Sequence, residues 1–168
     1  MTAAAVPLPG HPDAVSERRG FEARITPIAS DLLRYFARRV VPTDDAYDCL
    51  SETLIVLWRR RASLPATNDE LRAWSFGVAR KVLANHWRAQ QRYGVLIERA
   101  GHPDRRSEDP DILDALDSLG AQDRELVRLI VWDGFGVAEA GVILGLSAGA
   151  ARSRYSRARA RLRVALAD

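Results

Sequence analysis

The segment from Ser147 to Arg163, SAGAARSRYSRARARLR, carries six arginines within twelve residues. At about 100° per residue, its apolar side chains align along one face of a helix. The members of this stripe are Ala151, Tyr155, Ala158 and Leu162. An apolar stripe on a cationic helix needs a partner surface, so the rest of the chain must supply a core for it. The opposite ridge carries only small residues between the two rows of arginines.

The small outward ridge fits the major groove of B-DNA, which is roughly 12 Å wide and admits one helix between two phosphate walls.

The positive charge of the chain is concentrated near its C-terminal end. Residues 104–125 hold eight acids against three arginines, whereas residues 147–168 hold six arginines against one acid. A local basic end is typical of nucleic-acid-binding proteins. Charge runs also occur on solvated faces, so arginine content alone leaves a merely solvated helix open as an alternative.

Composition excludes several classes of protein. A chain of 168 residues with 47% hydrophobic content forms one domain or two small ones and is not disordered throughout. The single cysteine, Cys49, excludes an internal disulfide framework, and we interpret it as a small buried core residue. No apolar run approaches the roughly 18 residues of a membrane span, so we expect a cytoplasmic protein without membrane contact.

Catalytic signals are also missing from the sequence. His11, His86 and His102 belong to no Ser/His/Asp set or metal-ligand spacing, and the chain has no phosphate-binding glycine loop. We therefore expect no enzyme activity, no catalytic residue, no metal and no cofactor.

Apolar residues recur at helical spacing along the chain and no strand pattern is present, so the sequence predicts an all-α fold. We expect Pro27 to break the first helix early, residues 44–61 and 71–92 to be helices, and residues 62–70 to be a loop. We divide the chain into a disordered N-terminal tail at residues 1–20, a helical domain at 21–97, a flexible linker at 98–110 and a second helical domain at 111–168.

The second domain contains the signals of a helix-turn-helix motif. Short amphipathic helices are expected at residues 111–119 and 123–131, followed by a helix at 137–144. Gly145 and Leu146 form the turn, and Ser147 is the N-cap of the arginine-rich helix. The motif places the arginine-rich helix second, in the position of a recognition helix.

Two faces of the first domain have an unusual composition. On helix 44–61, Ile55 and Trp58 share a face with acids, and they either pack under a neighbouring helix or form a partner site. On helix 71–92, Trp87 stands at the edge of a cationic face. Stacking of unpaired bases on such an aromatic ring contributes roughly 1 to 3 kcal/mol per base. The alternative is that Trp87 closes the core.

Three segments, in this order, resemble the extracytoplasmic-function (ECF) group of the bacterial sigma-70 family. DDAYDCLSETLIVLW resembles the region 2 segment that usually reads D-A-E-D-L-V-Q-E-T-F-x-x-x-W. LRAWSFGVARKVLANHWR resembles the W-L-x-x-I-A-R-N segment that follows it. LGLSAGAARSRYSRARARLR resembles the region 4 ending L-G-x-S-x-G-T-V-K-S-R-x-x-R-A-R. The resemblance covers about residues 21–163.

The resemblance implies two helical domains, sigma region 2 and region 4, and three contact surfaces. The surface implied for the clamp helices of the polymerase beta-prime subunit comprises Asp45, Asp48, Glu52, Ile55 and Trp58. The surface implied for the minus-ten element and promoter melting comprises Asn68, Arg80, Lys81, Trp87 and Arg88. The surface implied for the minus-thirty-five element comprises Arg152, Ser153, Arg154, Ser156 and Arg157.

The resemblance further implies core RNA polymerase, including its beta flap, promoter DNA and an anti-sigma protein as partners. Some positions depart from the family pattern. Lys81 stands where Asn is usual, Gly141 where Ala is usual, and Ala151 where Val is usual. A helix-interior glycine costs roughly 1 kcal/mol relative to alanine, so we expect Gly141 to weaken region 4.

The alternative function is a stand-alone helix-turn-helix regulator of transcription. Such a protein needs a dimer face to bind paired half-sites. It also leaves the acidic, tryptophan-bearing face of helix 44–61 without a role.

Overall fold

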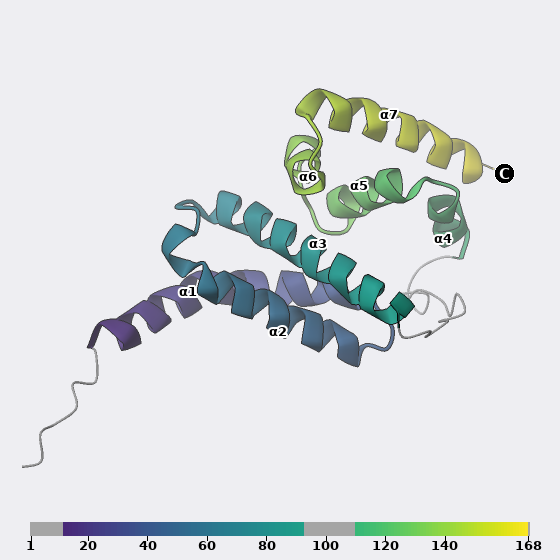
Figure 1. The fold of residues 1–168 in the computed structure, drawn as a ribbon. Helices are drawn as coiled ribbons and strands as arrows, with labels where there is room; N and C mark the ends of the chain where they lie inside the picture. The colour runs from purple at the N-terminus through teal and green to yellow at the C-terminus, as the bar shows by residue number, and fades with distance from the viewer. Residues whose placement is uncertain (1–11, 93–109, 168) are drawn as a thin grey trace, which may run out of the picture.

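The computed structural model describes residues 12–92 and 110–167, and within these ranges all regular secondary structure is helical (Figure 1). The N-terminal domain contains α1 (Pro12–Ala37), α2 (Asp44–Arg59), the short 3-10 helix η1 (Arg61–Ser63) and α3 (Asn68–Arg92). The C-terminal domain contains α4 (Pro110–Asp117), α5 (Ala121–Val131), α6 (Val137–Leu144) and α7 (Ala148–Ala165). The all-α prediction is confirmed. Residues 98–109 of the expected linker and residues 1–11 of the expected tail lie outside the described residues.

Helix α1 differs from the prediction in two ways. It begins at Pro12, so residues 12–20, expected to belong to a disordered tail, are helical. It also continues through Pro27, although proline removes one backbone hydrogen bond. Ile25 and Ile28, on either side of this proline, are both buried in the core. Packing of these neighbours explains why the helix is not interrupted, because tertiary contacts commonly outweigh local propensity.

Helices α2 and α3 pack against α1 and against each other. The prediction that Cys49 is a buried core residue is confirmed, and Ala46, Thr53 and Leu57 of α2 are buried with it. Acids in the first turn and an arginine in the last turn favour this helix through its dipole. Asn68, which we expected in a loop, is the first residue of α3, and its helix starts three residues before Leu71.

The C-terminal domain contains the predicted helix-turn-helix motif in α6 and α7. Gly145 ends α6 in the left-handed conformation at φ 72°, which glycine adopts without steric cost. Ser147 caps α7, and its side-chain oxygen accepts a hydrogen bond from the Ala150 amide at 3.2 Å. The apolar stripe of α7 faces inward, with Ala151 and Ala158 buried.

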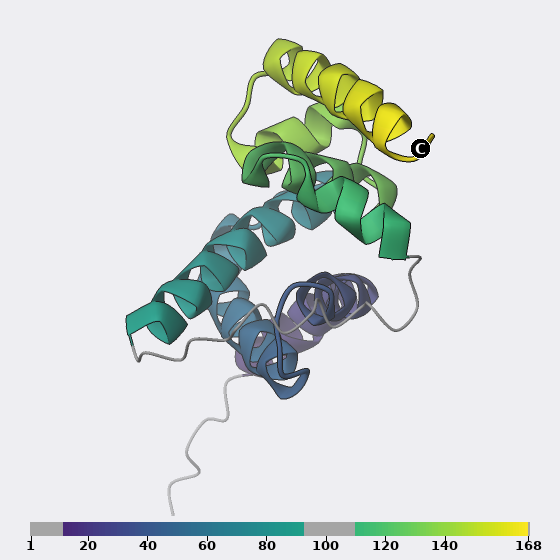
Figure 2. The same cartoon turned by 90° about the vertical axis from the view of Figure 1, so that its right-hand side faces the viewer.

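The two domains pack on one another, which the sequence did not predict. Figure 2 shows the C-terminal domain resting on α3, and α6 contacts α3 directly. Leu126, Leu129 and Phe135 of the C-terminal domain belong to the same buried cluster as the core of the N-terminal domain. The larger of the two buried clusters in the described structure therefore runs across both domains, and the smaller one lies within the C-terminal domain.

Candidate polymerase and nucleic-acid interfaces

Helix α7 presents most of the predicted minus-thirty-five residues to solvent. Arg152, Ser153, Ser156 and Arg157 are exposed. They lie outward because the buried alanines on the opposite face of α7 pack against α5 and α6. The outward surface therefore combines short side chains with cations, as the sequence predicted for a helix that enters a groove.

Arg154 is placed differently from its neighbours. Its Nη1 atom donates a hydrogen bond to Oδ1 of Asp123 at 2.8 Å, which joins α7 to the first turn of α5. Both side chains are partly exposed. Arg154 therefore has an acidic partner within its own domain, and any contact with a base must share this guanidinium with Asp123 or break the pair.

Four of the predicted minus-ten residues lie together in the C-terminal half of α3. Arg80, Lys81, Trp87 and Arg88 line a cleft of about 480 Å³. The other wall of the cleft is α5 in the C-terminal domain, including Arg124 and Arg128. Trp87 is 43% exposed, so it does not close the core. The structure thus brings an exposed aromatic ring and three cations of α3 to one face.

Asn68 lies apart from this cluster. It is the first residue of α3, whereas Arg80 stands twelve residues further along the same helix. At 1.5 Å per residue this separation is about 18 Å. The structure therefore gives Asn68 no contact with the cleft residues, and its predicted role depends on the DNA extending along α3.

Burial changes the electrostatics at the floor of the cleft. Tyr35 of α1 is fully buried there, and desolvation raises the pKa of its hydroxyl above the ordinary value. Desolvation also lowers the pKa of Arg128. For both groups the largest cause of the pKa shift is desolvation by burial.

The outward face of α2 holds the predicted polymerase-binding acids. Asp48 and Glu52 are exposed, and Ile55 is 51% exposed between them and the end of the helix. About half of this branched apolar side chain therefore stays uncovered beside the carboxylates. In Figure 1, α3 lies between α2 and the C-terminal domain.

The two other predicted members of this surface are held by the domain itself. Asp45 accepts a hydrogen bond from the Gln90 side chain at 3.1 Å and lies 3.3 Å from His86 Nε2. Trp58 packs edge-to-face against Phe21 of α1, with ring centroids 5.1 Å apart. Of the two alternatives left open for Ile55 and Trp58, packing under a neighbouring helix therefore applies to Trp58 and not to Ile55.

Two exposed apolar features were missed from the sequence. Tyr47 of α2 is 56% exposed next to the acidic face, at a position where the family pattern has Glu. In the C-terminal domain a groove of about 130 Å³ lies between α4, α5 and α7. Its apolar lining includes Ile112, Val131 and Leu166, which are 41%, 62% and 50% exposed. Helical periodicity gave no signal that these residues stay uncovered.

Within the described ranges, no group of three or more His, Cys, Asp or Glu side chains could hold a metal ion. In the same part of the chain, no helix combines the length and the apolar character that crossing a membrane requires. The fold and these surfaces define a two-domain helical protein with a helix-turn-helix module.

Comparison with known proteins agrees with this class. The family described as "Sigma-70 region 2" matches residues 29–93, and "Sigma-70, region 4" matches residues 110–162. The ECF RNA polymerase sigma factor SigF of Caulobacter vibrioides is 34% identical over 135 residues, which cover 76% of this chain and 74% of SigF. SigL of Mycobacterium tuberculosis is 28% identical over 150 residues, 83% of this chain and 85% of SigL.

A solved structure supports the same conclusion. The sigma factor RpoE of Bartonella quintana, in complex with the anti-sigma factor NepR, superimposes with a TM-score of 0.69 and 30% identity. The match covers 88% of this chain and 97% of RpoE. The chain belongs to the sigma-70 family, in its ECF group of RNA polymerase sigma factors.

Proposed function

We propose that this sigma factor uses four separate surfaces to join core RNA polymerase to promoter DNA and to open the DNA. It acts in the cytoplasm and performs no covalent chemistry, because the polymerase supplies catalysis. The observation that supports the proposal is the exposure of an acidic and apolar face on α2 together with the exposure of cationic residues on two other helices, α3 and α7. One protein can then hold the polymerase on one side and DNA on the others.

The α2 surface binds the clamp helices of the beta-prime subunit through Asp48, Glu52 and Ile55. Exposed apolar side chains surrounded by polar groups are typical centres of binding energy at interfaces. Asp45 supports this surface through its contacts with α3, and Trp58 supports it through Phe21.

The apolar groove of region 4 binds the beta flap. Val131 and Leu166 stay more than a third exposed on either side of it, and Leu162 forms part of its wall. An apolar segment of the flap would cover these side chains and remove them from water, which is favourable at about 25 cal/mol per Å².

The DNA is contacted by two helices. On α7, Arg152, Ser153, Ser156 and Arg157 read the minus-thirty-five element in the major groove, as recognition helices do. On α3, Trp87 stacks on an unpaired base of the minus-ten element while neighbouring cations hold the phosphates. Flipping that base costs a few kcal/mol, which these contacts offset.

An anti-sigma protein is the remaining proposed partner. The structurally similar RpoE was solved in complex with the anti-sigma factor NepR. Each of these four surfaces has exposed side chains, so a protein that covers any of them prevents initiation.

In vitro transcription tests the proposal. The purified chain, core polymerase and a genomic template pool should give transcripts with discrete start sites, and core polymerase alone should not. The variant Glu52→Lys, which reverses one exposed charge on the α2 surface, should abolish these transcripts. The matched control is Glu22→Lys, an equal charge change on the exposed part of α1. Absence of start-site-specific transcripts with the wild-type chain would defeat the proposal.

Tight, specific binding of the chain to a promoter duplex without polymerase would favour the stand-alone regulator instead. Electrophoretic mobility shift with and without core polymerase distinguishes the two functions.

A further inference from the structure

The cleft between α3 and α5 carries positive charge that is not balanced by acids. Arg80 and Lys81 of α3 line it, and neither side chain has an acidic partner within the described residues. Arg88, two turns further along, donates hydrogen bonds to the Asn85 side chain and the Ala84 carbonyl oxygen, which are both uncharged. Three cations of α3 can therefore bind an anion in the cleft without breaking an ion pair.

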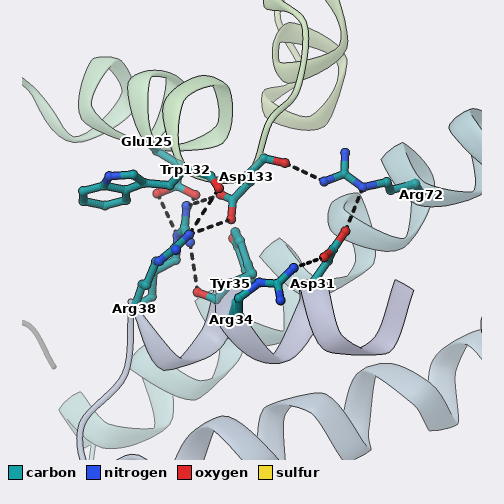
Figure 3. Close-up of polar contacts among 9 residues, drawn as sticks. Asp31, Arg34, Tyr35, Arg38, Arg72, Glu125, Trp132 and Asp133 are labelled. Carbon is teal, nitrogen blue, oxygen red and sulfur yellow. Dashed lines mark hydrogen bonds and ion pairs between the residues drawn. The ribbon is translucent and has the colours of Figure 1, made fainter. Parts of the chain in front are cut away.

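Glu125 of α5 is the one acid among the described residues that line the cleft, and its charge is already balanced. Figure 3 shows Glu125 and Asp133 of the C-terminal domain above Tyr35 of α1. The buried Arg39 side chain donates from Nε to both carboxylate oxygens of Glu125, at 3.0 and 3.1 Å, and from Nη2 to Asp133 at 2.9 Å. Arg39, rather than the cations of α3, therefore balances Glu125.

The opposite wall of the cleft includes the N-terminus of α5. Ala121 and Gln122 line the cleft, and Gly120 at the N-cap offers no side chain to the first turn. The first amides of a helix have no partner within the helix, and together with the helix dipole they favour a bound anion. Both walls of the cleft therefore favour negative charge.

An aromatic ring lies on the same face of α3 as the cations. Trp87 is seven residues after Arg80, which corresponds to two helical turns and about 10.5 Å. The Trp87 side chain is 43% exposed, and the short side chain of Ala84 lines the cleft between the two residues. Stacking of a nucleobase on such a ring raises affinity by about 5- to 150-fold. The cleft thus offers a stacking platform at one end and cations at the other.

The size and the floor of the cleft suit one small molecule. Its volume of about 480 Å³ falls within the roughly 300 to 1,000 Å³ of small-molecule sites. On the floor, the buried Tyr35 hydroxyl has no hydrogen-bond partner among the described residues. The Tyr35 ring contacts Phe76, one helical turn before Arg80, so Tyr35 lies at the cationic end. A phosphate oxygen at this end supplies an acceptor for the hydroxyl.

We propose that the cleft is a binding site for a nucleoside polyphosphate, with the base stacked on Trp87 and the phosphates held by Arg80, Lys81 and the N-terminus of α5. The site takes its residues from both domains. The inference goes beyond the proposed function and does not depend on it, because binding is a property of the free chain. Trp87 serves a nucleotide in the free chain and a promoter base in the polymerase complex.

Isothermal titration calorimetry of the full chain with ATP, inorganic triphosphate and adenosine, all without divalent metal, tests the site. ATP should bind at least about fivefold more tightly than triphosphate, because only ATP places a ring on Trp87. Adenosine should bind at least about tenfold more weakly than ATP, because it makes no hydrogen bonds between phosphates and cations. A wild-type chain that does not bind ATP, or binds it no more tightly than triphosphate, overturns the proposal.

The variant Trp87→Ala tests the base position. It should bind ATP no more tightly than triphosphate, and its affinity for triphosphate should equal that of the wild type. Tyr47→Ala is the matched control, since Tyr47 is 56% exposed on α2 outside the cleft, and it should keep the wild-type preference for ATP. If circular dichroism shows that Trp87→Ala has lost helix, Ala84→Leu fills the cleft instead and must lower the affinity for ATP at least about fivefold. A wild-type preference for ATP in the folded variant overturns the base position.

The variant Lys81→Glu tests the phosphate position. It should weaken the binding of both ATP and triphosphate by at least about tenfold. Arg92→Glu is the matched control, because it makes the same charge change at an exposed position of the same helix. It lies eleven residues, or about 16 Å, from Lys81, which exceeds the screening length of about 8 Å at 0.15 M salt. Equal losses in the two variants would show general charge attraction and overturn the site.

The variant Gln122→Glu tests the contribution of the C-terminal domain, because it adds a carboxylate to the α5 wall of the cleft. It should weaken the binding of ATP and triphosphate, whereas Gln91→Glu, the same change at an exposed position of α3 outside the cleft, should not. Unchanged affinity in Gln122→Glu overturns a site shared by the two domains. None of these measurements uses polymerase or promoter DNA, so failure of the sigma function in the transcription assay is a separate result.

Discussion

A Cβ atom built on Gly141 of α6 lies 2.7 Å from the Cβ of Ala151 in α7. Real Cβ atoms essentially never come this close, so the two helices of the helix-turn-helix motif cross at a point where only glycine fits. Both residues are buried. Helix propensity alone predicts that Gly141 weakens region 4, but the structure shows that it permits the close approach of α6 and α7.

We therefore expect Gly141→Ala to destabilise the protein despite the better helix propensity of alanine. Overpacking costs about 1 to 3 kcal/mol, against a propensity gain of about 1 kcal/mol. Urea unfolding followed by circular dichroism measures the net loss. Gly77→Ala is the matched control, because Gly77 is also inside a helix but has no atom within 4 Å of the added Cβ. It should stabilise the protein by about 0.5 to 1 kcal/mol. Equal effects at both positions would contradict the crossing argument.

The arginines of α7 should divide into two kinds. Arg152→Ala should cost about 1 to 3 kcal/mol and change the preferred minus-thirty-five sequence, because Arg152 lies near the front of the exposed face. Arg163→Ala should weaken binding about equally on all sequences and reduce the salt slope by about 1, as expected for one phosphate contact. Binding of the polymerase holoenzyme to a library of promoter duplexes at several salt concentrations measures both effects. Identical behaviour of the two variants would rule out the division.

Arg154 permits a separate test, because its ion pair with Asp123 has two interpretations. If Asp123 orients Arg154 toward a base, Arg154→Ala should relax specificity at one base pair, and Asp123→Asn should relax it less at that same position. Binding of the holoenzyme to the library of promoter duplexes shows at which base pair the specificity is relaxed. If both variants lower the unfolding temperature without changing base preference, the pair is structural and Arg154 does not read DNA.

On the α2 surface, we expect one residue to matter for polymerase binding and another for the stability of the fold. Ile55→Ala should weaken binding to core polymerase by about tenfold, or about 1.4 kcal/mol, and leave the unfolding temperature unchanged, since Ile55 is half exposed. Trp58→Ala should lower the unfolding temperature because it removes the contact with Phe21. Fluorescence titration with core polymerase and thermal unfolding measure the two quantities. A loss of stability in Ile55→Ala with intact binding would reverse the assignment.

Burial raises the pKa of the Cys49 thiol from 9.0 to about 11. The unfolded chain ionises this thiol first, so its contribution to the free energy of unfolding is complete below pH 9 and is lost as pH rises through 11. Between pH 8 and pH 11, the free energy of unfolding should fall more steeply with pH for the wild type than for Cys49→Ala. Parallel curves for the two proteins would show that burial does not shift this thiol.

The helices, the turn and the caps follow from local sequence. Ser147 and Gly145 mark the ends of α7 and α6 because a hydroxyl satisfies a helix N-terminus and glycine accepts a positive φ. The bounds of α6, and the buried stripes of α2 and α7, follow from periodicity in the same way. Pro27 was the exception, since the packing of its neighbours kept α1 continuous.

The candidate surfaces were only partly predictable. Exposure of Arg152, Ser156 and Ile55 agrees with the helical faces assigned from sequence. The partners of Arg154 and Asp45 were not predictable, because a helical pattern says which face is polar but not which side chain of another helix will meet it.

The sequence alone thus determined the periodic pattern of the seven α-helices in the described chain. It also determined the motif that carries the arginines and the family to which the motifs belong. Only the tertiary structure decided which distant groups meet. Arg39 and Asp133 are 94 residues apart and still form one buried pair. Gly141 and Ala151 touch because of how α6 and α7 cross. Such contacts depend on the relative placement of whole helices, which packing of the complete core sets and local periodicity does not encode.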